Sequence, residues 1–142
     1  MAEKKKTKLW GLWTIIDDKE SAFHAAKAGG ALCFYLAFCY GLEFVLLHFT
    51  GSTLFFGLVQ DREDYYFTSS IDLILVGAFV WLGIRIIIKN KLGIVPWICG
   101  WTMLELIVKN FLFPGKGLFI SVIVFIVIIN AWRGWLNSRR YP

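Results

Sequence analysis

Residues 69–113 read SSIDLILVGAFVWLGIRIII-KNK-LGIVPWICGWTMLELIVKNFLF, two long apolar stretches separated by one short basic segment. Each stretch has about 20 residues, and at about 1.5 Å of rise per helical residue it is long enough to cross the hydrocarbon core of a bilayer. The link at 89–91 leaves room only for a tight reversal. We therefore expect two antiparallel helices, at 69–88 and 92–113, that are neighbours.

Two further apolar stretches, at 29–49 and 117–132, extend this pattern to four spans. The chain has 142 residues, of which 58% are hydrophobic, and its mean hydropathy of +0.63 is too high for a soluble domain of this size. We therefore predict an all-α fold, an integral membrane four-helix bundle formed as one domain by residues 19–142. Residues 1–18 are expected to form a basic cytoplasmic tail and an N-terminal interfacial segment that contains tryptophan.

Polar residues are scarce in the fourth span. Every residue of the stretch 118–129 is aliphatic or aromatic except Ser121, and Asn130 follows it directly. Because a helix with so few polar groups has little need of polar partners inside a bundle, we expect the fourth span to be the most lipid-exposed of the four.

The basic residues are distributed unevenly between the two sides of these spans. If the N-terminus is cytoplasmic, 12 of the 15 Lys and Arg residues lie on or near the cytoplasmic side. They are Lys4, Lys5, Lys6, Lys8, Lys19, Lys27, Arg85, Lys89, Lys91, Arg133, Arg139 and Arg140. This positive-inside pattern predicts four crossings with both termini in the cytoplasm. The net charge of +5 then reflects topology and contact with anionic lipid headgroups, and we do not expect nucleic-acid binding.

Tryptophan and arginine side chains mark the predicted cytoplasmic ends of the bundle. Trp favours the headgroup level of a bilayer, and basic side chains are attracted to anionic lipids there. The expected membrane-interface anchors are Trp10, Trp13, Trp132, Arg133 and Trp135.

The segment before the first span carries two helix signals. Asp17 or Asp18 is placed to cap a helix that begins at Lys19, since a short carboxylate accepts hydrogen bonds from the free N–H groups of a helix N-terminus. Small residues then recur every four positions, which allows a second helix to approach closely. The two rows are Ala22, Ala26 and Gly30, and Ala25, Gly29 and Cys33. We expect this face to pack against another helix.

The residue types that carry most enzyme or metal chemistry are scattered. Cys33, Cys39 and Cys99 lie inside predicted spans without a C-x-x-C pair, so we expect no metal site and no cofactor. His24 and His48 fall at opposite membrane faces and cannot be paired haem ligands, but a pigment or haem held by His48 alone stays open. The chain shows no Ser-His-Asp setting and no glycine-rich phosphate loop, and we expect no enzymatic activity.

Three carboxylates in the apolar stretches fall at one predicted depth. Counting helical rise places Glu43 about 21 Å from the cytoplasmic start of its span, and Glu105 about 20 Å from the start of its own. The same count places Asp72 at a similar height in the second span. Lys109 follows Glu105 by one helical turn and is expected to pair with it. His48 lies a little farther out.

Two interpretations of these residues remain open. In the functional interpretation, clustered acids at one depth bind a proton or a cation, as membrane carboxylates do in proton-coupled carriers. In the structural interpretation, Lys109 neutralises Glu105, and Asp72 reaches water at the interface or caps its own helix. Glu43 then takes His48, another chain or its own proton as its partner.

Short sequence patterns occur at both ends of the chain. The entry runs from Leu9-Trp10 through SAFHAAK at 21–27, and the exit is NAWRG at 130–134. These patterns resemble those of a loose group of small bacterial four-helix inner-membrane proteins without assigned function, which end in Asn-x-x-Arg-Gly. The resemblance implies a multi-pass protein of the cell inner membrane and implies no catalytic residues.

The lack of recognisable chemistry and the small-residue face of the first helix favour a non-enzymatic accessory or scaffold subunit. Such a protein would work as an oligomer or with other membrane subunits in a larger complex. The alternative is a small proton- or cation-coupled transporter that uses the carboxylates Glu43, Asp72 and Glu105.

Overall fold

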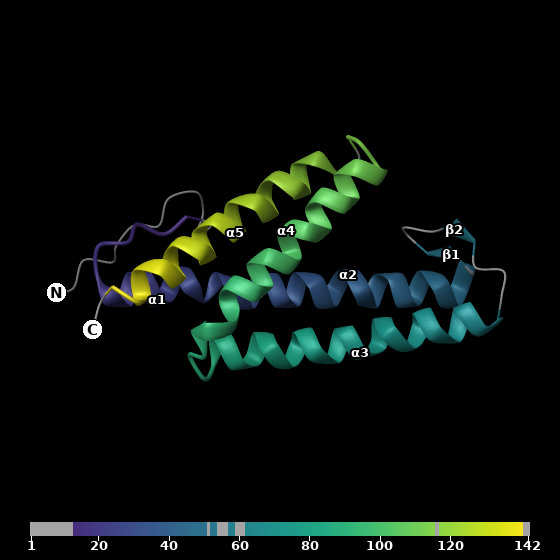
Figure 1. Cartoon of the computed structure of the whole chain (residues 1–142), viewed down its shortest axis with the longest axis horizontal. Coiled ribbons are helices and arrows are strands. Elements are labelled where there is room, and N and C mark those ends of the chain that lie inside the picture. Colours follow the sequence, from purple (N-terminus) through teal and green to yellow (C-terminus); the bar gives the residue numbers. More distant parts are fainter. Residues whose placement is uncertain (1–12, 51, 54–56, 59–61, 116, 141–142) are drawn as a thin grey trace.

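The computed structural model describes residues 13–50, 52–53, 57–58, 62–115 and 117–140. Its elements in chain order are α1 (Lys19–Ala26), α2 (Ala28–Thr50), β1 (Ser52–Thr53), β2 (Gly57–Leu58), α3 (Arg62–Ile87), a short 3₁₀ helix (Leu92–Ile94), α4 (Val95–Leu112) and α5 (Leu118–Ser138) (Figure 1). The two short strands pair antiparallel between α2 and α3. In this part of the chain four helices are long and apolar enough to cross a membrane, so the predicted number of candidate spans is confirmed.

The first candidate span is longer than predicted, because α1 continues almost directly into α2 as a rod over Lys19–Thr50. The predicted cap at its start is confirmed. The carboxylate of Asp18 accepts a hydrogen bond of 2.8 Å from the backbone N–H of Ser21, and the Ser21 hydroxyl accepts one from the backbone N–H of Asp18. This reciprocal pair satisfies N–H groups that have no partner within the helix.

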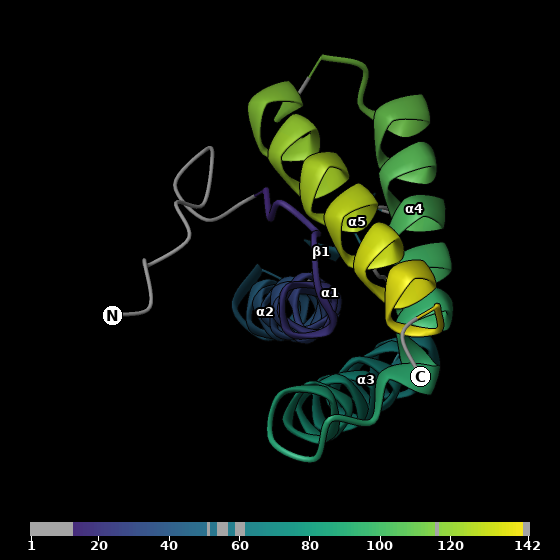
Figure 2. The ribbon, with the colours of Figure 1, turned by 90° about the vertical axis from the view of Figure 1, so that its left-hand side faces the viewer.

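The expected packing of residues 69–113 as one helix pair is wrong. The chain does reverse at Asn90, which has a positive φ of 52°. After the turn, however, α3 packs along α2, whereas α4 leads away and packs with α5 (Figure 1). Seen along α2, α3 lies on one side and the α4–α5 pair on another (Figure 2). A short link forces two helices to reverse direction, but the side chains decide which helix each one packs against.

The helices approach most closely at the end of the bundle that contains α1. A Cβ atom built on Gly134 of α5 would lie 2.6 Å from the carbonyl carbon of Ala25 and nearer still to the backbone nitrogen of Ala26. A Cβ on Gly30 would lie 2.5 Å from the side chain of Ile87 in α3. The small-residue face predicted for the first helix is therefore a packing face, and it is used within the chain.

Bulkier side chains separate the helices farther along. Beyond Gly30, α2 carries the large residues Tyr35, Tyr40 and Phe44, and Trp101 of α4 lies next to Tyr40. The distance between two packed helices depends on the side chains at the contact. The α4–α5 hairpin accordingly diverges from α2 toward its tip (Figure 1). Residues of α2, α4 and α5 line a cavity in this wedge between the diverging helices.

The expectation that the fourth span is the most exposed is wrong. Only 22% of the apolar stretch of α3 is buried, against 33% for that of α5. Asn130 of α5 is buried, and its side-chain oxygen accepts a 3.1 Å hydrogen bond from the backbone N–H of Thr14. This polar residue ties α5 to the segment that precedes α1, because a buried amide is costly without a partner.

The predicted anchor residues that the structure describes lie where the segment before α1 meets α5. The Arg133 guanidinium lies 4.2 Å from the ring centroid of Trp13, and the rings of Trp132 and Trp135 are 5.4 Å apart. Trp10 lies outside the described residues. Stacking of guanidinium on indole links α5 to the N-terminal segment, whether or not these groups also contact lipid.

Gly134→Ala should destabilise the fold by about 1–3 kcal/mol, because its new methyl group meets the backbone of α1. Gly77→Ala is the matched control, since a Cβ there meets no atom within 4 Å. Unfolding of both variants in mild detergent, followed by circular dichroism, gives the comparison. Equal stability of the two variants would contradict the close α1–α5 contact.

Candidate functional site

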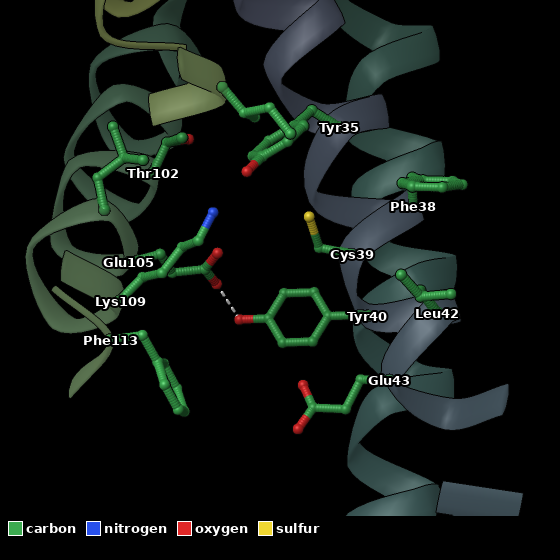
Figure 3. Close-up of a pocket in the computed structure, with 12 residues that line it drawn as sticks. Tyr35, Phe38, Cys39, Tyr40, Leu42, Glu43, Thr102, Glu105, Lys109 and Phe113 are labelled. Atoms are coloured by element: carbon green, nitrogen blue, oxygen red, sulfur yellow. Dashed lines mark hydrogen bonds between the residues drawn. The ribbon is translucent and has the colours of Figure 1, made fainter. Parts of the chain in front are cut away.

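Two adjoining cavities occupy the wedge where the helices diverge. The smaller, of about 430 Å³, lies between α2, α3 and α4. The larger, of about 540 Å³, lies between α2, α4 and the start of α5 (Figure 3). Tyr40, Glu43 and Glu105 line both cavities, so the two spaces share one polar wall.

The structure brings the three predicted carboxylates into the lining of the smaller cavity. Glu43 comes from α2, Asp72 from α3 and Glu105 from α4. Glu43 and Asp72 are buried, with only 6% and 4% of their surfaces exposed. Helical rise predicted a common height for these residues, and the divergence of α4 places a cavity at that height.

Asp72 has an open hydrogen-bond acceptor. Its Oδ2 atom is buried and has no hydrogen-bond partner among the residues that the structure describes. A buried carboxylate oxygen without a donor is costly, so this site favours a proton or an added donor. The expectation that Asp72 reaches water or caps its own helix does not fit this burial.

Glu105 is held by two aromatic donors. The Tyr40 hydroxyl donates a hydrogen bond to its carboxylate (Figure 3), and the Trp101 indole N–H donates another of 2.8 Å. The bond from Tyr40 connects α2 to α4, whereas the bond from Trp101 lies within α4. Each hydrogen bond to a charged group contributes about 1.5–3 kcal/mol.

The expected pairing of Glu105 with Lys109 is not what the described residues show. The hydrogen-bond donors to this carboxylate are Tyr40 and Trp101, and the Lys109 ammonium lies near Gly117 at the start of α5. Helical side chains lean toward the N-terminus of their helix, which directs Glu105 to Trp101, one turn back. Lys109 instead lines the larger cavity.

His48 lies apart from the carboxylates. It is exposed, its Nδ1 atom is 2.7 Å from the hydroxyl of Tyr65 on α3, and it stacks on Phe44. It lines neither of the two cavities. The structure therefore separates His48 from the group in which the sequence placed it.

Aromatic rings support the walls of the site, which the sequence did not reveal. Tyr40 and Phe79 stack with ring centroids 5.8 Å apart, and Phe79 lies 6.2 Å from Trp101. Tyr40 of α2 and Trp101 of α4 line the smaller cavity, and Phe79 of α3 packs against both of their rings. The four-residue spacing of Trp101 and Glu105 was the available signal for the indole–carboxylate bond.

The three carboxylates are not arranged as the ligands of one metal ion. Within the described residues, no group of three His, Cys, Asp or Glu side chains is arranged to hold a metal ion. A Ca²⁺ ion needs six or more oxygen ligands that converge on it, and a Mg²⁺ ion needs ligands in a nearly octahedral arrangement. The arrangement can bind protons, or a cation large enough to fill the space.

Comparison with known proteins adds no further assignment. No protein-family model, curated protein or solved structure matches this chain.

Tyr40→Phe and Glu105→Leu should be strongly coupled in unfolding free energy. Leucine cannot accept the hydrogen bond from Tyr40, and phenylalanine cannot donate it, so the double variant should lose about 0.5–3 kcal/mol less than the sum of the single losses. The matched cycle of Lys109→Met with Glu105→Leu should be close to additive. Coupling found in the Lys109 cycle but not in the Tyr40 cycle would contradict the observed bonding.

Proposed function

We propose that the protein is a small multi-pass membrane protein that acts as a proton- or cation-coupled transporter, with the carboxylate-lined cavity as its binding site. The observation that carries this proposal is the convergence of Glu43, Asp72 and Glu105 on one cavity between three helices. Ionisable groups inside candidate membrane helices mark ion and proton pathways in many membrane proteins.

Insertion into a membrane is supported by the surface of the bundle. Large apolar side chains project outward from its helices, including Trp97, Phe111 and Phe119, which are 78–85% exposed. Such a surface favours lipid as its surroundings. The uneven distribution of basic residues supports an orientation with both termini in the cytoplasm, and the resemblance noted above favours a bacterial inner membrane.

The geometry favours this role over that of an accessory or scaffold subunit. The scaffold hypothesis drew support from a small-residue face on the first helix. That face packs against α5 of the same chain at Gly134, so it no longer argues for a partner protein. By contrast, three carboxylates that line one cavity can bind protons or a cation there, as the transporter hypothesis requires.

Coupling follows from the chemistry of a buried carboxyl group. A carboxyl that carries a proton cannot at the same time form an ion pair with a cation, so the two compete for one site. Access from the two sides of the membrane would alternate by movement of the α4–α5 hairpin. The pivot would be the end of the bundle that contains α1, where Gly134 of α5 meets α1 and Gly29 of α2 meets Val95 at the start of α4.

Flux measurements in proteoliposomes test this proposal. With Na⁺, K⁺ or tetramethylammonium supplied in turn as the exchanging cation, the wild-type protein should collapse an imposed pH gradient faster than empty liposomes. Asp72→Asn should reduce the rate to background, because an amide neither binds a proton nor pairs with a cation. Glu20→Gln is the control, since Glu20 is exposed on α1 and lines neither cavity. Wild-type liposomes that behave like empty ones, or full flux through Asp72→Asn, would refute the function.

A further inference from the structure

We infer that the cation bound in the smaller cavity is a protonated organic amine with an apolar or aromatic body. The inference rests on the proposed function of this cavity and names its substrate class. Among the described residues, the lining of this cavity contains three carboxylates and no Lys, Arg or His side chain. An anion is therefore disfavoured by like-charge repulsion, and a cation is favoured.

Size separates an organic cation from a metal ion. The cavity volume of about 430 Å³ lies in the range of about 300–1,000 Å³ that is usual for small-molecule sites. The carboxylates do not converge on a point as metal ligands do. A ligand that fills this space must bring substantial apolar volume with its charge.

The rest of the lining matches such a body. Tyr40, Phe67 and Trp101 present aromatic surface, and aromatic faces attract ammonium groups within about 6 Å. Aliphatic side chains complete the wall: Ile71, Leu75, Leu104, Val108 and Leu112. Apolar walls with a few placed polar groups are typical of sites that orient small molecules.

Asp72 is the group that receives the ammonium. Glu105 already accepts hydrogen bonds from Tyr40 and Trp101, whereas Asp72 Oδ2 is buried and lacks a donor within the described part of the chain. An alkylammonium supplies up to three N–H donors and a positive charge. Asp72 lines the cavity but its Oδ2 atom is buried, so binding would turn the carboxylate until this oxygen faces the cavity, where one charge-assisted bond from the ammonium would satisfy it.

The amine has two possible sources with the same chemistry. It is either a soluble amphiphilic amine or the ammonium of a phosphatidylethanolamine headgroup. The larger cavity, which adjoins through Tyr40, Glu43 and Glu105, contains Lys109, whose charge suits a lipid phosphate. An experiment can distinguish these sources because the lipid composition can be set.

The first test measures binding to the full-length protein in nanodiscs of phosphatidylglycerol, with empty nanodiscs as the baseline. By calorimetry, 2-phenylethylammonium should bind about tenfold or more tightly than 2-phenylethanol, which has the same shape without the charge. Asp72→Asn should remove this preference and Glu20→Gln should keep it. Equal affinity for the amine and the alcohol would overturn the inference.

A second measurement uses only the wild-type chain and so does not depend on the folding of a variant. A hydrophobic carbodiimide should label Asp72, as located by mass spectrometry of peptides, and 2-phenylethylammonium should protect it while 2-phenylethanol does not. Labelling that the amine leaves unchanged would contradict binding at Asp72.

Adding phosphatidylethanolamine to the nanodiscs identifies the source. If the added lipid weakens the Asp72-dependent binding of 2-phenylethylammonium, the site belongs to the lipid headgroup. If the lipid leaves this binding unchanged, the site belongs to a soluble amine. Proton flux that persists without amine binding would reject the inference and keep the proposed function. Amine binding without any flux would reject transport and keep the ligand class.

Discussion

The close approach of α5 to α1 is the contact on which the rest of the structure depends. With no side chain at Gly134, the backbone of α5 lies against Ala25 and Ala26, and the bond from Thr14 to Asn130 secures the segment before α1 on the same helix. Gly30 permits a similar approach of α3 to α2. Helices that meet so tightly at one end and carry large side chains at the other must diverge.

The divergence explains why a small chain contains cavities at all. Packed interiors normally leave few voids larger than a water molecule. Here the rings of Tyr40, Phe79 and Trp101, one each from α2, α3 and α4, contact one another beside the cavities, and Tyr40 and Trp101 form part of the lining of the smaller one.

The carboxylates in this wedge are treated differently by their surroundings. Glu105 is fixed by Tyr40 and Trp101, which stabilises its charge and ties two helices together. Asp72 is more deeply buried, and its Oδ2 atom has no donor within the described residues. An unpaired polar atom costs the most free energy where water is excluded and the dielectric constant is low, so the lack of a donor is costly at Asp72. The two carboxylates therefore differ in what holds them: Glu105 has two donors, and Asp72 Oδ2 has none among the described residues.

The sequence by itself determined the features that depend on local periodicity and length. It predicted four long apolar helices, the cap at Asp18, the small-residue packing face and the common height of the three carboxylates, because helical rise and spacing are the same in every fold. Tertiary structure alone decided the partners: α3 with α2, Glu105 with Tyr40 and Trp101, and Asn130 with Thr14. Which side chains meet across helices depends on how closely the backbones approach, and this distance is the joint result of contacts between residues far apart in the chain.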